Sequence, residues 1–218
     1  MSEHDPVRGY SRAEEIANSV THGLGAILSI AGLVVLIVLA SLRGTAWHIV
    51  GVSVFGGSLV ILYSASAIYH GVSAPRVKHW FRVMDHAAIF LLIAGTYTPF
   101  TLVNLRGPWG WSLFGTVWGL AAVGVILQTG VIKRGATASV LLYLAMGWII
   151  VLAIKPLMTS VESGGLVLLV AGGLSYTVGV IFFAWRKLPF GHAVWHGFVL
   201  AGSVSHFFAV LLYVIPKA

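Results

Sequence analysis

The sequence predicts an all-α integral membrane protein, a bundle of seven transmembrane helices with its N-terminus in the cytoplasm and its C-terminus outside. Two features of composition lead to this class, since 58% of the 218 residues are hydrophobic and only 9% are charged. Soluble domains carry about 25% charged residues, so cytosolic enzymes and secreted modules are excluded. The third feature is a row of apolar stretches of about 20 residues, the length that a helix needs to cross a bilayer.

The seven expected spans follow one another with short connections, so residues 1–218 form one membrane domain whose first part, at about 1–18, is cytoplasmic. The spans lie at about 20–42, 46–70, 84–104, 109–130, 136–155, 165–185 and 192–214. Glycine, proline and basic residues separate them in order, at 43–44, 73–76, 104–108, 133–135, 156–165 and 186–189.

Three local patterns add detail to the expected helices. Ser11 and Glu14 fit a capping box, which predicts a short interfacial helix before the first span, with a frayed tail as the alternative. Pro99 predicts a kink or an end in the third span, where neighbouring hydroxyls can satisfy the freed carbonyls. The Gly-x-x-x-Gly pattern at Gly115 and Gly119 predicts close packing between helices.

The basic residues set the expected orientation, because the cytoplasmic loops of membrane proteins are enriched in Lys and Arg. Nine fall on the side of the N-terminus: Arg8, Arg12, Arg76, Lys78, Arg82, Lys133, Arg134, Arg186 and Lys187. Four fall on the opposite side: Arg43, Arg106, Lys155 and Lys217. The net charge of +7 therefore reflects an asymmetry across a bilayer, and no nucleic-acid partner is expected.

Ionisable residues inside spans cost about 2.5–3.5 kcal/mol each at the membrane centre, so their positions are informative. Five of them fall at the cytoplasmic ends of their spans, although more than a hundred residues separate the first from the last. They are His70 at the end of the second span, Asp85 and His86 at the start of the third, and His192 and His196 at the start of the seventh. The sequence thus predicts one polar site near the cytoplasmic face.

A zinc ion is the expected occupant of this site. His192 and His196 lie one helical turn apart, so both imidazoles can face one point. With His70 they offer three neutral nitrogen donors, the ligand set of a catalytic zinc ion with an open fourth position. The chain has no cysteine, so a metal can bind only through His, Asp or Glu. A lone His pair at this spacing more often serves interhelical hydrogen bonding, but a third His and an acid at the same depth favour Zn²⁺.

Asp85 and Ser66 are the expected catalytic residues. Asp85 is the only acid predicted within the second to seventh spans. It could take a proton from a metal-bound water, orient that water, or hold a ligand imidazole in its tautomer. Ser66 lies one turn before His70 and could donate a hydrogen bond to the site or to a substrate oxygen. His86 is expected to lie beside Asp85 as its hydrogen-bond partner.

Further polar residues are expected around the ligands. Glu15, Asn18 and His22 form a stripe on one face of the first helix. We expect the stripe to lie behind the ligands, with a solvated helix entry as the equal alternative for Glu15 and a buried position for His22. His206 follows His196 by ten residues and lies about 15 Å deeper, where it is expected to make an internal polar contact.

In combination, these motifs resemble the hemolysin III family of bacterial membrane proteins. The matching residues are Glu15, Asn18, His22, Ser66, His70, Asp85, His86, Pro99, His192 and His196, with Ala94-Gly-Thr-Tyr-Thr leading into Pro99. That family is related to the progestin and adipoQ receptors, which include the adiponectin receptors, and more distantly to the alkaline ceramidases. The resemblance covers essentially the whole chain.

The resemblance implies a seven-helix protein of a bacterial plasma (inner) membrane, with a zinc ion near the cytoplasmic face. It implies that His70, His192 and His196 bind the zinc ion. It also implies that Asp85 contacts the zinc-bound water, with Ser66 nearby. The family's name refers to a haemolytic phenotype, but the sequence shows nothing built to form a pore in a foreign membrane.

Three functions are compatible with these residues. The first is a zinc-dependent, ceramidase-like hydrolase of a lipid amide or ester, whose substrate enters from the bilayer and whose role is in membrane homeostasis. The second is a receptor-like or structural membrane protein in which zinc staples the second, third and seventh spans. The third and weakest is an ion or proton pathway through Asp85, His22 and His206, for which the fourth to sixth spans offer hardly any ionisable partners.

Overall fold

The computed structural model describes residues 10–129, 136–185 and 187–216, and within these ranges every regular element is helical. The helices are α1 (Arg12–Arg43), α2 (Ala46–Gly71), α3 (Pro75–Pro99), the π-helix η1 (Phe100–Asn104), α4 (Pro108–Gln128), α5 (Ala136–Trp148), the 3₁₀-helix η2 (Ile149–Ala153), α6 (Ile154–Ser160), α7 (Ser163–Ala184) and α8 (Gly191–Tyr213). Seven helical segments are long and apolar enough to cross a membrane, with α5, η2 and α6 contributing one of them. This confirms the predicted seven-helix membrane fold.

Two helices begin earlier than the sequence predicts, both at the same end of the bundle. The Ser11–Glu14 capping box is present, with the Ser11 amide donating to Glu14 Oε2 at 2.9 Å. It opens α1 itself, however, so the expectation of a separate interfacial helix was wrong. The helix α3 begins at Pro75, nine residues before the expected start at 84. Charged residues in these first turns fall outside any apolar window, although the helices continue through them.

Pro99 ends α3 as expected, and the chain continues without a break into the π-helix η1. A proline cannot donate its backbone nitrogen to the preceding turn. Hydroxyls beside it donate to backbone carbonyls instead, from Thr98 to Ala94 at 2.8 Å and from Thr101 to Tyr97 at 3.0 Å. Two carbonyls beside the irregular segment are therefore bonded by its own side chains.

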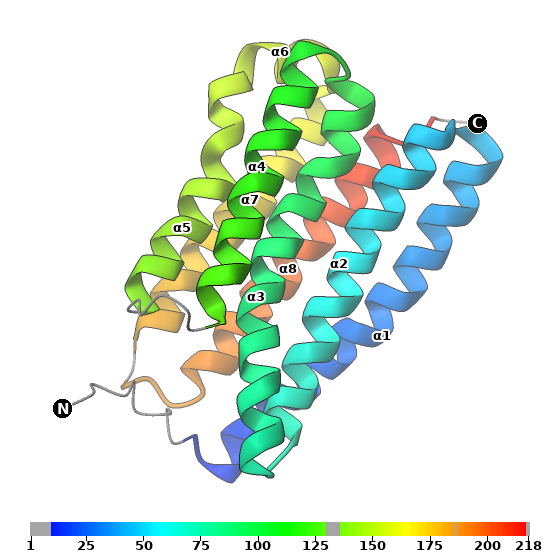
Figure 1. Ribbon diagram of the computed structural model, residues 1–218. Helices are drawn as coiled ribbons and strands as arrows, with labels where there is room; N and C mark the ends of the chain where they lie inside the picture. Colours follow the sequence, from blue (N-terminus) through cyan, green and yellow to red (C-terminus); the bar gives the residue numbers. More distant parts are fainter. Residues whose placement is uncertain (1–9, 130–135, 186, 217–218) are drawn as a thin grey trace.

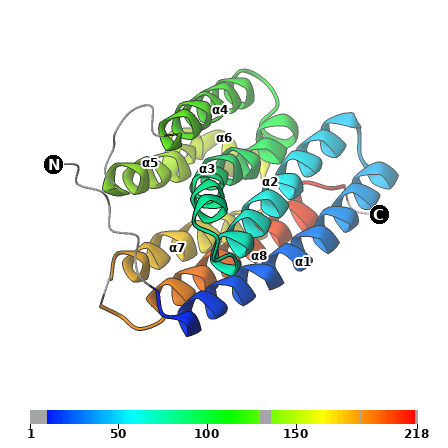
Figure 2. The ribbon, with the colours of Figure 1, turned by 60° about the horizontal axis from the view of Figure 1, so that its bottom comes forward.

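The helices lie side by side with roughly aligned axes (Figure 1). The helices α1, α2 and α3 pack in chain order, α8 packs against α1, and α7 packs along α8. The helix α4 covers α3 on the side away from α1, as Figure 2 shows from the end of the bundle. Outward-facing apolar side chains on α1, such as Val20 and Leu42, are 65% and 75% exposed, as expected for a surface that faces lipid.

Glycines allow helices to pack closely at some positions, but not at the predicted pair, Gly115 and Gly119. A Cβ at Gly124 on α4 would collide with the ring of Phe90 on α3, so these helices approach closely there. A Cβ at Gly115 or Gly119, in contrast, would meet nothing within 4 Å. The Gly-x-x-x-Gly pattern therefore makes no close contact within the described bundle, and its predicted packing role was wrong.

The described basic residues separate between the two ends of the bundle. Arg12, Arg76, Lys78, Arg82 and Lys187 lie at the end where α1, α3 and α8 begin. Arg43, Arg106 and Lys155 lie toward the opposite end. The remaining residues of the charge count, Arg8, Lys133, Arg134, Arg186 and Lys217, lie outside the described ranges. The histidine-rich end of the bundle is thus also its basic end.

Gly124→Ala should lower thermal stability, because the added methyl group must displace the Phe90 ring. Overpacking of this kind costs about 1–3 kcal/mol. The matched control is Gly115→Ala on the same helix, where the methyl group meets open space and stability should be unchanged or slightly raised. Thermal unfolding of the two variants in one detergent compares them directly, and equal midpoints would contradict the close approach of α3 and α4.

Candidate metal centre

Three histidines from two helices converge at the basic end of the bundle. His70 lies in the last turn of α2, while His192 and His196 lie in the first two turns of α8. One ring nitrogen from each lies within 4.8 Å of the others, so the group could hold a metal ion. His70 and His196 are buried, at 3% and 2% exposure. The structure thus brings together the three histidines that the sequence predicts as ligands.

The first turns of α1 fix the orientation of two of the three imidazoles. Glu15 Oε2 lies 2.6 Å from His70 Nδ1, and a carboxylate oxygen only accepts, so His70 donates from Nδ1. His196 Nδ1 lies 3.3 Å from the backbone carbonyl of Asn18 and likewise donates. In both rings Nε2 is therefore the atom with a lone pair. His70 Nε2 is buried and has no hydrogen-bond partner among the described residues.

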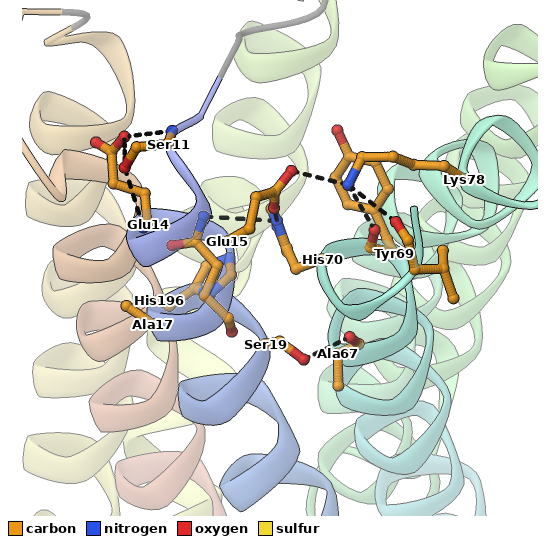
Figure 3. Close-up of polar contacts among 12 residues, drawn as sticks. Ser11, Glu14, Glu15, Ala17, Ser19, Ala67, Tyr69, His70, Lys78 and His196 are labelled. Atoms are coloured by element: carbon orange, nitrogen blue, oxygen red, sulfur yellow. Dashed lines mark hydrogen bonds and ion pairs between the residues drawn. The ribbon is translucent and has the colours of Figure 1, made fainter. Parts of the chain in front are cut away.

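Lys78 completes the support behind Glu15. Its Nζ lies 2.8 Å from Glu15 Oε1 and also donates to the backbone carbonyls of Tyr69 and Val72, at 3.0 and 3.4 Å. One carboxylate thus bridges a cation on α3 and an imidazole on α2 (Figure 3). Glu15 therefore contacts the site directly and does not belong to a purely solvated helix entry. Lys78 had been predicted only as a cytoplasmic charge, because nothing in its spacing showed that α3 already begins at Pro75.

Aromatic rings enclose the cluster from two sides. The buried ring of His22 stacks on His196 with centroids 3.4 Å apart, and its other neighbour is Tyr63 at 4.9 Å. Tyr10 lies 5.9 Å from His70 and 5.2 Å from His192, measured between ring centroids. The buried position predicted for His22 is confirmed, and Tyr10 is a neighbour that the sequence patterns did not reveal.

Asp85 and Ser66 lie inside the bundle beside the histidines. Asp85 is 9% exposed, and its carboxyl interacts electrostatically with His86 and His70. Ser66 is fully buried, and its hydroxyl interacts with the carboxyl of Asp85. His86 does not have the hydrogen bond expected of it, since its Nδ1 donates to the Arg82 carbonyl at 2.7 Å. The reason is helix geometry, because a carbonyl one turn earlier lies directly under the ring.

A cavity of about 1200 Å³ opens beside the cluster. Its wall includes His22, Asp85, His192 and His196 at the basic end of the bundle and His206 at a deeper level. Between these polar groups it is lined mainly by apolar side chains of α3, α5, α7 and α8. Ligand pockets usually measure about 300–1,000 Å³, so the space is large enough for a long-chain molecule.

The donor set fits a divalent ion that accepts nitrogen ligands. Two of the three imidazoles, His70 and His196, already donate their outer nitrogen to a carboxylate or a carbonyl, which is the usual arrangement around such ions. Zinc binds imidazole nitrogen at about 2.0–2.1 Å, so two of its ligand atoms lie at most about 4.2 Å apart. The 4.8 Å limit of the described atoms is close to this value and can be closed by small side-chain rotations.

The fold and the cluster define a class, a multi-pass membrane protein with a candidate metal centre at one end of its bundle. Residues 10–207 match the Haemolysin-III related family, and the chain belongs to this family. It is 53% identical over 205 residues to Hemolysin-3 of Bacillus cereus, with 94% of each chain covered. It is 46% identical over 202 residues to the Hemolysin-3 homolog of Bacillus subtilis (strain 168), covering 93% of this chain and 95% of that one.

A more distant similarity reaches animals. The chain is 30% identical over 206 residues to the Monocyte to macrophage differentiation factor of Homo sapiens, covering 92% of this chain and 84% of that protein. The predicted family is thereby confirmed. Together with the seven apolar helices, it makes this chain a multi-pass bacterial membrane protein.

Glu15→Gln should weaken metal binding about 10- to 100-fold, the usual effect of losing a carboxylate behind a ligand imidazole. Gln keeps the shape of the side chain but removes the charge that orients His70 and pairs with Lys78. Competition with a chromogenic Zn²⁺ chelator measures the affinity. Glu162→Gln, at the start of α7, removes one charge far along the chain from the cluster and serves as control. Equal affinities of the two variants would contradict the role of Glu15.

Proposed function

We propose that this protein is a zinc-dependent hydrolase that cleaves an amide or ester bond of a membrane lipid. One observation carries the proposal: two of the three clustered imidazoles, His192 and His196, share the wall of one largely apolar cavity with the buried carboxyl of Asp85. If zinc only held helices together, the metal ligands alone would be sufficient. A hydrolase also needs an acid beside them and a space for the substrate.

Zinc bound by three histidines supplies a water molecule whose pKa falls toward about 7 and a Lewis acid that polarises a carbonyl oxygen. The residues of this chain would hold the ion, and the contacts of Nδ1 leave Nε2 of His70 and His196 available as the donor atoms. No cysteine or second carboxylate is required for this ligand set.

Asp85 is the proposed general base and acid. Its carboxyl can accept a proton from the attacking water and then deliver it to the leaving amine or alcohol, and its burial keeps bulk water from competing for that proton. Ser66 is the proposed hydrogen-bond donor to the substrate carbonyl oxygen, because its buried hydroxyl lies beside the carboxyl of Asp85. Both act at the level of the histidines, where the lipid's polar linkage must lie.

The cavity explains why a lipid is the proposed substrate. Most of the side chains that line it are apolar, so an acyl chain can occupy it while the amide or ester stays among the polar residues. The exposed apolar surface of the surrounding helices lies in the membrane, and a lipid can therefore enter between helices without crossing water. Membrane homeostasis is the proposed physiological setting.

Asp85→Asn should abolish lipid hydrolysis while zinc remains bound. Losing a general acid and base typically lowers the rate about 10²- to 10⁴-fold. Fatty acid release from ceramide and from phospholipid measures the rate, and metal analysis of the same preparations measures zinc. His196→Ala is the contrasting variant, which should lose zinc and turnover together. A zinc-loaded wild type that releases no fatty acid from either lipid would contradict the proposal.

A structural role for zinc is the second candidate, because the ligands come from two helices, α2 and α8, that are far apart in the chain. A ligand at a free concentration of about a hundred times its Kd stabilises the folded protein by about 2.7 kcal/mol. His70→Ala should therefore lower the unfolding temperature and abolish its rise on adding Zn²⁺. If turnover is absent from the wild type while this stabilisation is present, the staple describes the protein and the hydrolase does not.

The centre is proposed to lie at the cytoplasmic face, where the basic residues gather. Since the chain has no cysteine, single variants can report the orientation. Ser73→Cys lies between α2 and α3, at the end that holds the centre, and Ser160→Cys lies at the opposite end of the bundle. In intact cells a membrane-impermeant maleimide should label Ser160→Cys and leave Ser73→Cys unlabelled until the cells are opened. The reverse pattern would overturn the orientation.

A further inference from the structure

A second polar group lies deeper in the bundle, away from the metal centre. His206 on α8 is buried at 7% exposure, and Tyr176 on α7 lies beside it with ring centroids 5.5 Å apart. The hydroxyl of Tyr176 lies 2.9 Å from Ser203 Oγ, which also accepts a hydrogen bond from Tyr63 at 2.8 Å. Residues of α2, α7 and α8 thus meet in one buried polar cluster.

The hydrogen bonds of this cluster leave one defined acceptor. His206 Nε2 lies 3.2 Å from the backbone carbonyl of Leu169, which only accepts, so Nε2 carries the proton. A neutral imidazole then has a lone pair on Nδ1. That atom is buried and has no hydrogen-bond partner among the described residues. Burying such a group unpaired is unfavourable, and a ligand that donates a hydrogen bond would relieve the cost.

A glycine on α7 makes room for the imidazole ring of His206. A Cβ at Gly172 on α7 would collide with the imidazole of His206, so the ring lies directly against the α7 backbone. Both His206 and Tyr176 belong to the wall of the same cavity that reaches Asp85 and His196. The polar cluster and the metal centre are therefore two polar levels of one largely apolar cavity.

The spacing of the two levels defines a ligand class. Ten residues separate His196 from His206 on α8, which is about 15 Å along the helix. An extended hydrocarbon chain of roughly a dozen carbons covers that distance. We propose that His206 Nδ1 and the Tyr176 hydroxyl bind a hydroxyl group carried within the chain of a lipid whose head lies at the metal centre. This rests on the proposed function insofar as the head group is placed there.

A hydroxyl suits the pair better than other occupants. It can donate to the imidazole nitrogen and accept from the phenol, which a ketone or an ester carbonyl cannot do. A water molecule could bond the same two groups, but it would leave uncovered the apolar side chains beside them in the cavity wall, such as Leu166 and Val170. A hydroxylated chain satisfies both requirements, since its carbons cover the apolar wall.

The test compares octadecanoic acid with 12-hydroxyoctadecanoic acid, which differ by one hydroxyl at the expected distance from the carboxyl. Calorimetric titration of the full-length protein in detergent measures Kd for each, and zinc content is measured on the same samples. Wild type should bind the hydroxylated acid about three- to tenfold more tightly, the effect of one hydrogen bond. His206→Leu and Tyr176→Phe should each reduce this preference while binding octadecanoic acid unchanged.

Ser205→Ala is the matched control, because it removes a hydroxyl next to His206 that bonds the Ala201 carbonyl outside the cavity. It should keep the full preference. Equal affinities of wild type for the two acids, no binding of either, or an undiminished preference in both His206→Leu and Tyr176→Phe would overturn the hydroxyl site. If His206→Leu fails to fold, Tyr176→Phe alone decides. A zinc-free wild type that retains the preference would instead overturn the zinc hydrolase and leave the hydroxyl site standing.

Discussion

The contact of α1 with the Nδ1 atoms of two imidazoles is the constraint on which the centre depends. His70 and His196 come from α2 and α8, which are far apart in the chain. Each ring could turn either of its nitrogens toward the other. Glu15 and the Asn18 carbonyl, less than one helical turn apart, accept from both Nδ1 atoms and leave both Nε2 atoms facing inward. A helix that supplies no candidate ligand therefore sets the tautomer of two candidate ligands, and shifting it by one residue would remove both contacts.

The polar residues deeper in the bundle form a second polar level below the centre. From the centre, contacts run from His196 to His22 to Tyr63 and on to Ser203. The steps at His22 are ring contacts, and neither of its nitrogens has a hydrogen-bond partner among the described residues. A proton file requires hydrogen-bonded donors and acceptors at each step, and between the described residues the contacts of His22 supply none.

Much of this structure could be predicted from the sequence, for physical reasons. Apolar length determines the spans, and helical spacing places His192 and His196 on one face of α8, so both were predicted correctly. Packing partners could not be predicted, because they depend on how helices far apart in the chain meet. Gly115 and Gly119 have the spacing of a helix-packing motif, but no described atom lies within 4 Å of a Cβ built there. Gly124 belongs to no such motif, yet the ring of Phe90 packs against it. The hydrogen-bond partner of His86 was missed for a similar reason, since the local carbonyl of Arg82 outcompetes a neighbouring side chain.

The two misplaced helix starts belong to the same end of the molecule as the centre, and the connection is physical. Hydropathy detects a helix only while it is apolar, but a helix that carries Glu15 or Lys78 in its first turns extends past the hydrocarbon with charged side chains. The capping box at Ser11 satisfies the exposed amides of α1, and Pro75 at the start of α3 has no amide to satisfy. Each device extends its helix by the turns that bring Glu15 and Lys78 together behind His70. The first turns of α1 and α3, which hydropathy alone does not detect, are thus the turns that support the candidate metal centre.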